Sequence, residues 1–466
     1  MGKELAGQLF PSKHRATMNV PGNPRLKDQQ VAREVRYSDA APMIEQVTSS
    51  RSKKWSVALL VVILSVGIFL RIWPSAGFRQ FGDDARVQNP PGALAQKSGI
   101  WVGKDERAYS TYVAMAQKDG IWNFGDVVHA YVQLQTKRSD AIVPATRVGF
   151  LVPATIVAEI TRLDPLAALR CTSLISSILL LLATALIGYR LGGSECMLLL
   201  TALMAVAPLQ IHLAHLSLID GYFAFWAVLS AWLLWENLQA QRQQGWLVAY
   251  GFSLFMLVLT KENAAFVFLA LVTVSVVFAF RKLSFLLILV SVIAPMLAVL
   301  LLAGLVGGVA EWISFYRAFA QKSAALSYVI LYQDGAWYRY LVDFTLLSPC
   351  IVVLAVGSLF RIRQESKPDI FWALFLGVSY VTMSSVPYGM SLRFAAYWDV
   401  PLRWLAVSQV IHLTRRIGKE RPLFISVTIL AILIAIDLFQ YWRYFVHGQI
   451  YDPVSFQLLR ASKLVK

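Results

Sequence analysis

Residues 51–70 read RSKKWSVALLVVILSVGIFL, in which a basic cluster directly precedes a largely apolar run. A helix needs about 20 mainly apolar residues to cross the hydrocarbon core of a bilayer. Lys and Arg residues that flank a span are usually kept on the cytoplasmic side. The stretch therefore predicts a first membrane span whose amino-terminal end lies inside the cell.

The composition indicates a membrane protein without a separate soluble domain. Of the 466 residues, 57% are hydrophobic and 15% are charged, whereas soluble domains have about 25% charged residues. The net charge is +16, and basic clusters recur in short segments between apolar runs, where membrane orientation explains them better than a nucleic-acid partner. The three cysteines, Cys171, Cys196 and Cys350, form neither a zinc-binding spacing nor a disulfide framework.

Residues 1–54 are polar, mixed in charge and contain several prolines, and they lack the apolar core of a signal peptide. We expect a mostly disordered cytoplasmic tail. From Trp55 to residue 442 the sequence predicts an all-α polytopic membrane bundle of about eleven helices. The predicted spans lie at about 55–73, 168–190, 196–213, 220–238, 246–260, 264–280, 283–306, 342–360, 370–386, 400–413 and 423–442.

One apolar run, residues 141–163, could span the membrane or lie on its surface. It contains two prolines together with Arg147, Glu159 and Arg162. If it spanned, the basic clusters of the later loops would face outward, against the positive-inside rule. Those clusters are Arg190, Arg242, Arg281-Lys282, Arg361 to Lys367 and Arg415 to Arg421. We therefore expect an interfacial helix with its charges toward water.

This topology predicts a long first external loop at 74–167, a second external loop at 307–341 and an external carboxyl-terminal tail at 443–466. The protein would be a multi-pass protein of the plasma (inner) membrane. Four polar groups fall on the same external face, and ionisable groups at membrane depth usually mark a site or a pair. They are Asp105-Glu106 in KDERAY, His212, His215 and Asp220 in HLAHLSLIDG, Lys261-Glu262 in LTKENAAF, and Arg393, Tyr397 and Asp399 in SLRFAAYWDVP.

The order of these motifs resembles the lipid-linked-sugar glycosyltransferases of the C-type superfamily. DExxY at 105–109 is followed by GYRLGG, then HLSLIDGYFAFW and LTKE. Within that superfamily the sequence most resembles glycosyltransferase family 39, of the protein O-mannosyltransferase and aminoarabinose-transferase type. The resemblance covers roughly 55–280 and implies a C-type bundle that moves a monosaccharide from a polyprenyl-phosphate carrier to an acceptor hydroxyl. The acceptor could be a protein, a lipid or a glycan on the external (periplasmic) side.

The resemblance also suggests residue roles. The family's first-loop acidic pair falls on Asp105 and Glu106, with Asp105 as general base or acceptor binder and Glu106 in support. Its next acidic position falls on Asp220 and its lysine on Lys261. The family usually has an arginine at the position of His215. The candidates for the donor phosphate are therefore His215, Lys261 and Arg393, and the further candidates are Tyr109, His212 and Tyr397.

The chemistry fits these residue types. Arg and Lys suit a phosphate leaving group, and a carboxylate can accept the proton of the acceptor hydroxyl in a single, inverting displacement. His212 and His215 lack a clear third ligand, so no metal site is predicted, and a need for a divalent cation stays open.

Each motif also has a structural alternative. An acidic pair often opens a helix, Lys261 and Glu262 could form a local ion pair, and Arg393 could be an interface anchor. The rival function is a transporter or flippase of lipid-linked intermediates. Such a protein typically has two related halves, and the sequence shows no internal repeat of that kind.

Overall fold

The computed structural model describes residues 41–73, 103–239, 244–279, 284–362, 367–387, 389–417 and 422–465. The chain divides into two compact units, Met1–Ala58 and Leu59–Lys466. Most of the predicted disordered tail lies outside the described residues. Its described part is helical, because helix α2 begins at Ala41 and runs to Ile72. A helix formed by an apolar span can extend into a polar segment, since nucleation is the costly step.

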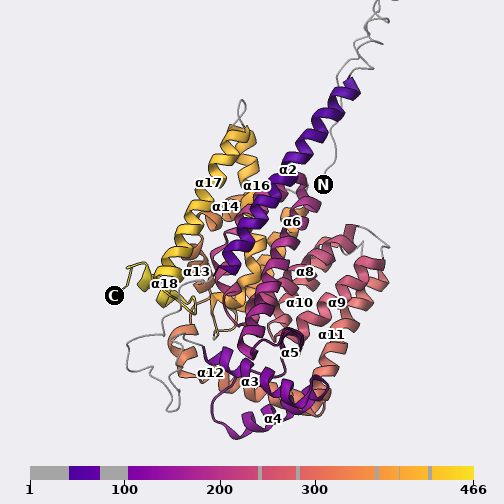
Figure 1. Cartoon of the computed structure of the whole chain (residues 1–466), viewed down its shortest axis with the longest axis vertical. Helices are drawn as coiled ribbons and strands as arrows, with labels where there is room; N and C mark the ends of the chain where they lie inside the picture. Colours follow the sequence, from indigo (N-terminus) through magenta and orange to yellow (C-terminus); the bar gives the residue numbers. More distant parts are fainter. Residues whose placement is uncertain are drawn as a thin grey trace, which may run out of the picture. The chain divides into compact units, whose positions relative to one another are not determined.

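The described part of the second unit is built from helices, and no strand occurs in it (Figure 1). Its first half contains α3 (Lys104–Asp119), α4 (Phe124–Lys137), α5 (Val148–Thr161), α6 (Pro165–Ala205), α7 (Pro208–Ala214), α8 (Ile219–Gln239), α9 (Gln244–Thr260) and α10 (Ala264–Ala279). Its second half contains α11 (Phe285–Val306), α12 (Val309–Ala324), α13 (Arg339–Leu347), α14 (Pro349–Leu359), α15 (Lys367–Ser384), α16 (Asp399–Ile417), α17 (Pro422–Tyr441) and α18 (Ser455–Ala461). Short helical turns are η1 (Ile121–Asn123), η3 (Val329–Gln333), η4 (Leu392–Trp398) and η5 (Trp442–His447).

Helices occupy every segment predicted to span the membrane, which confirms the all-α polytopic fold. Among the described residues, four helical segments are long and apolar enough to cross a bilayer, judged by length and composition. They are Trp55–Ile72, Pro165–Ala205, Phe285–Val306 and Phe424–His447. The spans formed by shorter helices remain predictions.

Helix α6 contains the predicted span 168–190 and the first part of the predicted span 196–213, joined at a sharp turn, and α7 carries the rest of the second span. Gly193 interrupts the helix with a φ of 73° and a ψ of −165°, a conformation that side chains other than hydrogen strongly disfavour. The two arms pack tightly beside the turn, since a Cβ on Gly188 would lie 2.8 Å from the Cα of Met197. The pair is therefore a helical hairpin, as the spacing of the apolar runs predicts.

Helix α5 is the segment that the sequence left open between a span and a surface helix. Its 14 residues extend about 21 Å, less than the roughly 30 Å of hydrocarbon. It packs on α3, α6 and α9. The expectation that all its charges face water is wrong for Arg147, whose guanidinium is largely buried and pairs with Glu262; Glu159 and Arg162 are exposed as expected.

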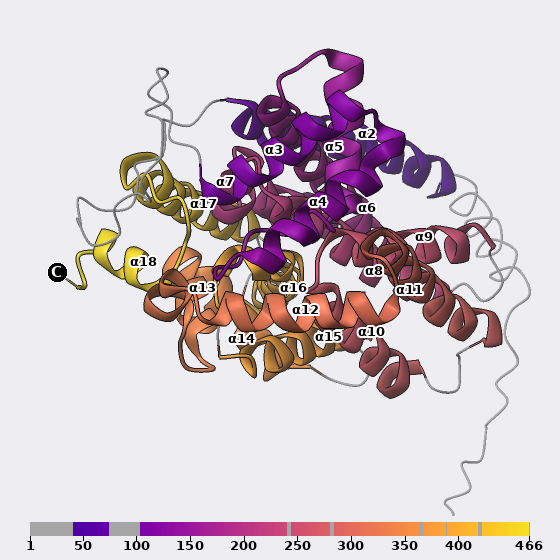
Figure 2. The ribbon, with the colours of Figure 1, turned by 90° about the horizontal axis from the view of Figure 1, so that it is seen from below.

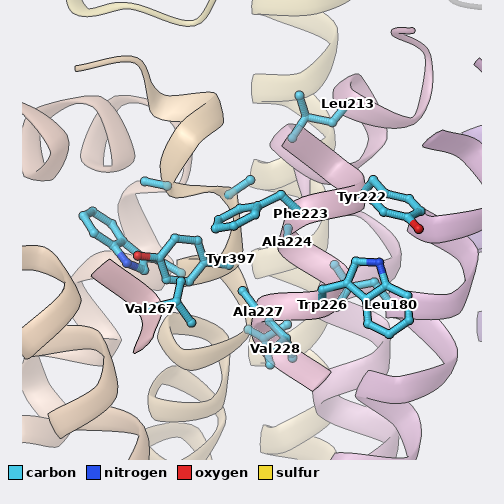
Figure 3. Close-up of a cluster of buried hydrophobic side chains, with 14 of the residues drawn as sticks. Leu180, Leu213, Tyr222, Phe223, Ala224, Trp226, Ala227, Val228, Val267 and Tyr397 are labelled. Atoms are coloured by element: carbon cyan, nitrogen blue, oxygen red, sulfur yellow. The ribbon is translucent and has the colours of Figure 1, made fainter. Parts of the chain in front are cut away.

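Helix α8 lies in the core and fixes the position of the site. It packs on α6, α9 and η4. Phe223, Ala227 and Val228 of α8 are buried in an apolar cluster with Leu180 of α6 and Tyr397 of η4 (Figure 3). A helix that is apolar on all sides is usually buried, and this one carries Asp220 in its first turn.

The described helices α3, α4 and α12 of the two predicted external loops lie at one end of the helical bundle. Helices α3 and α4 come from the first loop and α12 from the second, and all three lie toward the lower end in Figure 1 and toward the viewer in Figure 2. Lys322 of α12 donates hydrogen bonds to the carbonyl oxygens of Gln135 and Arg138 at the end of α4. The loops therefore form one layer next to the segments that carry the candidate residues.

Candidate active site

Arg393 is the centre of a cluster of charged side chains. Its Nη2 atom donates to Oδ2 of Asp105 at 2.9 Å. Its Nε atom lies 3.7 Å from Oδ2 of Asp220 and 3.7 Å from Oδ1 of Asp452. The cluster joins α3, α8, η4 and the segment before α18, which are distant in the sequence.

Asp105 and Glu106 stand in the first turn of α3, where acidic groups interact favourably with the helix N-terminus. Glu106 is buried, and its Oε2 accepts from the backbone nitrogen of Gly103 at 2.9 Å while its Oε1 accepts from that of Ser217 at 2.7 Å. This ties α3 to the turn before α8. The side chain of Asp105 is 33% exposed, so it is the one carboxylate at Arg393 with substantial access to solvent.

Asp220 and Lys261 form a buried ion pair. Nζ of Lys261 lies 2.5 Å from Oδ1 of Asp220, and each side chain is 3% exposed. The ammonium also lies 3.7 Å from the centroid of the Phe394 ring, a cation–π distance. Burial lowers the pKa of Lys261 to about 8, although Asp220 opposes the shift.

The sequence left open a local ion pair between Lys261 and Glu262. In the structure Glu262 pairs with a different residue. It binds Arg147, with 2.8 Å between Oε2 and Nη2. Arg147 also donates to the hydroxyl of Tyr109, so the predicted candidate Tyr109 lies beside this second pair. Burial alone would raise the pKa of Glu262, but the charge of Arg147 outweighs burial and holds that pKa below its usual range.

Asp452 was not predicted as a site residue because it lies in the segment 443–466, which the sequence presents as an external tail. The structure buries its side chain. Oδ1 accepts from the hydroxyl of Ser391 at 2.5 Å, and Oδ2 accepts from Tyr328 at 2.7 Å and Gln333 at 2.9 Å. The only sequence signal was an aspartate between a tyrosine and a proline after the last apolar run.

The two candidate histidines contact backbone carbonyls. Nε2 of His215 donates to the carbonyl oxygen of Leu70 at 3.0 Å, at the end of α2. Nε2 of His212 donates to that of Tyr451 at 2.8 Å, and its ring stacks on Phe445. Burial lowers the pKa of His215, which reduces its positive charge and its suitability for phosphate.

Tyr397 and Asp399 point to other parts of the bundle. Tyr397 is buried in the apolar cluster of Figure 3, where its hydroxyl contacts the sulfur of Met383 at 3.1 Å. Asp399 accepts from Gln210 and lies 3.6 Å from Arg403, one turn later on α16. Their contacts give both residues a place in the packing of the bundle.

The charges of the central cluster compensate one another. Three carboxylates, on Asp105, Asp220 and Asp452, share the cations of Arg393 and Lys261. Burial alone would lower the pKa of Arg393, but the carboxylates of Asp452, Asp105 and Asp220 outweigh burial and hold that pKa well above its usual range. Within the described ranges, no group of three or more His, Cys, Asp or Glu residues could hold a metal ion.

Comparisons with known proteins agree with this architecture. Residues 155–319 match the family of dolichyl-phosphate-mannose-protein mannosyltransferases. The match includes Asp220 and Lys261 but not Asp105, Arg393 or Asp452. No curated protein sequence matches the chain.

Solved structures resemble the chain over most of its length. The oligosaccharyltransferase of Archaeoglobus fulgidus in its apo form has a TM-score of 0.56 and 13% identity, over 86% of this chain. The chain spans 57% of that protein. ArnT from Cupriavidus metallidurans, also in its apo state, has a TM-score of 0.52 and 14% identity, over 88% of this chain and 76% of ArnT.

At these identities the structures show a common fold, and the family match supplies a sequence relationship over the part that carries α6 to α11. The solved structures and the family match agree with the resemblance that the order of motifs along the chain indicates. The expected resemblance is confirmed: the chain has the fold of the C-type glycosyltransferases, and its residues 155–319 match their protein O-mannosyltransferase family.

Proposed function

We propose that this chain is a membrane glycosyltransferase that moves a monosaccharide from a polyprenyl-phosphate carrier to an acceptor hydroxyl on the external face. The observation that carries the proposal is the contact between Arg393 and the partly exposed Asp105, beside the buried Lys261. Arg393 lies against a carboxylate that solvent reaches, and Lys261 is joined to Arg393 through Asp220. The cations can stabilise an anionic leaving group, and the carboxylate can accept the proton of a hydroxyl nucleophile.

The solved relatives support a polyprenyl-phosphate donor. ArnT from Cupriavidus metallidurans has been solved with undecaprenyl phosphate bound. The archaeal oligosaccharyltransferase AglB from Archaeoglobus fulgidus has been solved with an inhibitory peptide and a dolichol-phosphate. We assign the donor phosphate of this chain to Arg393 and Lys261. His215 is the weaker candidate because burial reduces its charge.

Donor binding and release of the base are coupled in the proposed mechanism. The donor phosphate takes the place of Asp105 at Nη2 of Arg393, since Asp220 and Asp452 are buried and held by other partners. Asp105 then accepts the proton of the acceptor hydroxyl. The hydroxyl oxygen bonds to the anomeric carbon, the bond from that carbon to the phosphate oxygen breaks, and its electron pair leaves with the phosphate. The anomeric carbon is inverted.

The remaining acidic residues hold this arrangement. Asp220 keeps Lys261 in the site through the 2.5 Å contact. Glu106 fixes the start of α3, and hence Asp105, against Ser217. We therefore assign Glu106 and Asp220 as positioning residues, and the acceptor as a protein, lipid or glycan hydroxyl.

The test is a transfer assay with the full chain in liposomes. Radiolabelled undecaprenyl-phosphate sugars are supplied with protein, lipid and glycan acceptors, and labelled product is measured. We expect product that depends on both donor and acceptor. If no donor is consumed while labelled carrier crosses the bilayer, the proposal is wrong and the chain is a flippase of lipid-linked intermediates.

A further inference from the structure

The segment after α17 is packed into the molecule. Ile450, Tyr451, Asp452 and Val454 are 6%, 7%, 2% and 0% exposed. The chain turns into this segment at Gln449, which has a φ of 50°. Residues that follow the last long helix therefore belong to the core of the external layer.

This segment contacts the start of the acidic helix α3. A Cβ on Gly103 would overlap the hydroxyl end of Tyr451, so the close approach depends on glycine. The carbonyl oxygen of Tyr451 accepts from His212 on α7 at 2.8 Å. The segment is thus fixed on two sides, immediately next to Asp452.

Asp452 is held by three donors from two other segments. Ser391 precedes η4, Tyr328 precedes η3 and Gln333 ends η3. An ionised carboxylate only accepts hydrogen bonds, so its two oxygens can satisfy all three donors at once. Oδ1, which accepts from Ser391, is also the oxygen 3.7 Å from Nε of Arg393.

We infer that Asp452 is a positioning residue that holds Arg393 with Nη2 directed at the donor phosphate. The inference rests on the function proposed above. In that mechanism Asp105 leaves Arg393 when the donor binds, so the guanidinium must be held from its Nε side. Asp220 shares its charge with Lys261, whereas Asp452 has no other cationic partner among the described contacts.

The direction of the effect follows from the geometry. Asp452→Asn keeps the size of the side chain but replaces one acceptor oxygen by a donor. Arg393 then loses a charge partner, and an amide NH2 takes the place of an acceptor oxygen either at Ser391 or at Tyr328 and Gln333. We expect the affinity for undecaprenyl phosphate to fall about 10-fold, within the range measured for coupled charged contacts.

The experiment measures binding of undecaprenyl phosphate to the full chain in nanodiscs. Wild type, Asp452→Asn, Arg393→Gln and the double variant are compared, with thermal unfolding as a check of folding. If Asp452 acts through Arg393, the double variant binds no more weakly than Arg393→Gln. Asp334→Asn is the matched control, because it removes an exposed carboxylate from the same external layer.

A second pair of variants keeps the inference testable if Asp452→Asn does not fold. Ser391→Ala removes the hydrogen bond to Oδ1 of Asp452, the oxygen that faces Arg393. Tyr328→Phe removes a hydrogen bond to Oδ2, the other oxygen. We expect Ser391→Ala to weaken binding more than Tyr328→Phe does.

The outcomes separate the inference from the proposed function. If wild type fails to bind undecaprenyl phosphate, the proposed function fails and the role of Asp452 fails with it. If wild type binds but Asp452→Asn binds equally well, only the role of Asp452 is wrong. Additive effects of Asp452→Asn and Arg393→Gln, or equal effects of Ser391→Ala and Tyr328→Phe, also contradict it.

Discussion

Asp105 accepts a hydrogen bond from Nη2 of Arg393, which makes it both the proposed base and a competitor of the donor phosphate. Asp105→Asn removes the base and weakens the competitor. We expect transfer to fall by about 10²–10⁴, while undecaprenyl phosphate binds at least as tightly as to wild type. The measurements are the transfer rate in liposomes and binding in nanodiscs.

Asp119→Asn is the control for Asp105→Asn, because Asp119 is an exposed carboxylate at the other end of α3. It should leave both measurements unchanged. Equal transfer by wild type and Asp105→Asn would remove Asp105 from the base role. A loss of binding together with transfer would instead place Asp105 among the groups that hold the donor.

The lowered pKa of Lys261 predicts that activity falls at alkaline pH. Burial lowers its pKa to about 8, so the ammonium is charged below that pH and neutral above it. If the charged form binds the donor phosphate, kcat/KM for the donor should fall about tenfold per pH unit above pH 8. The profile of kcat/KM against pH measures this, since it reports groups of the free enzyme.

Lys261→Arg is the companion variant, because an arginine stays charged across this range. Its alkaline limb should move to higher pH even if the overall rate is lower. Identical alkaline limbs in wild type and Lys261→Arg would assign the fall to another group.

Most members of the charged cluster around Arg393 were singled out by the sequence, but their pairing was not. Asp220, Lys261 and Arg393 are ionisable groups near the ends of apolar runs, which is a strong local signal, whereas Asp105 was singled out by its DExxY motif. Lys261 and Glu262 are neighbours in sequence, yet they pair with Asp220 and Arg147 respectively. The packing of α5, α8 and the α9–α10 turn determines those partners. The local sequence does not specify this packing.

At the scale of helices, the site depends on how closely α5 approaches α9. A Cβ on Gly149 would lie 2.9 Å from the carbonyl carbon of Leu259. Backbone atoms cannot move aside as a flexible side chain can. Gly149→Ala should therefore separate the helices, disturb the Arg147–Glu262 pair and lower the free energy of unfolding by about 1–3 kcal/mol. Thermal unfolding in detergent is the measurement.

Gly377→Ala is the matched control within helix α15. A Cβ there meets no atom within 4 Å, and Ala in a helix interior is favoured over Gly by about 0.5–1 kcal/mol. Gly377→Ala should thus keep or raise the unfolding temperature. If both variants shift the unfolding temperature equally, the close approach of α5 to α9 at Gly149 does not contribute to the stability of the protein.

Long apolar helices were predictable because about 20 apolar residues in sequence leave few alternatives to a span. The segment that contains Asp452 was not predictable, because its burial depends on contacts with α7, η3 and η4 rather than on any periodicity of its own. Helix α5 lies between these cases. The positive-inside rule favoured a surface helix over a span, but the burial of Arg147 required knowledge of Glu262.

At the scale of the whole bundle, charged contacts join the loops at each end. Glu195 in the turn region of α6 pairs with Arg415 at the end of α16, and Arg361 after α14 lies 3.6 Å from Asp369 in α15. These segments were all predicted to be cytoplasmic. The cluster around Arg393 joins segments that were all predicted to be external. Both sets of contacts thus agree with the predicted topology, in which each contact joins loops on the same side of the membrane.

Cysteine labelling tests this assignment of sides. Cys171, Cys196 and Cys350 are first replaced by Ala, and single cysteines are then introduced at Thr111→Cys on α3 and Ser194→Cys in the turn of α6. Both positions are exposed. Because Lys and Arg are retained on the cytoplasmic side, a membrane-impermeant maleimide should label Thr111→Cys on intact cells and Ser194→Cys only after permeabilisation. The reverse pattern would place Asp105 and Arg393 on the cytoplasmic side, and the donor sugar would then have to be presented to the enzyme there.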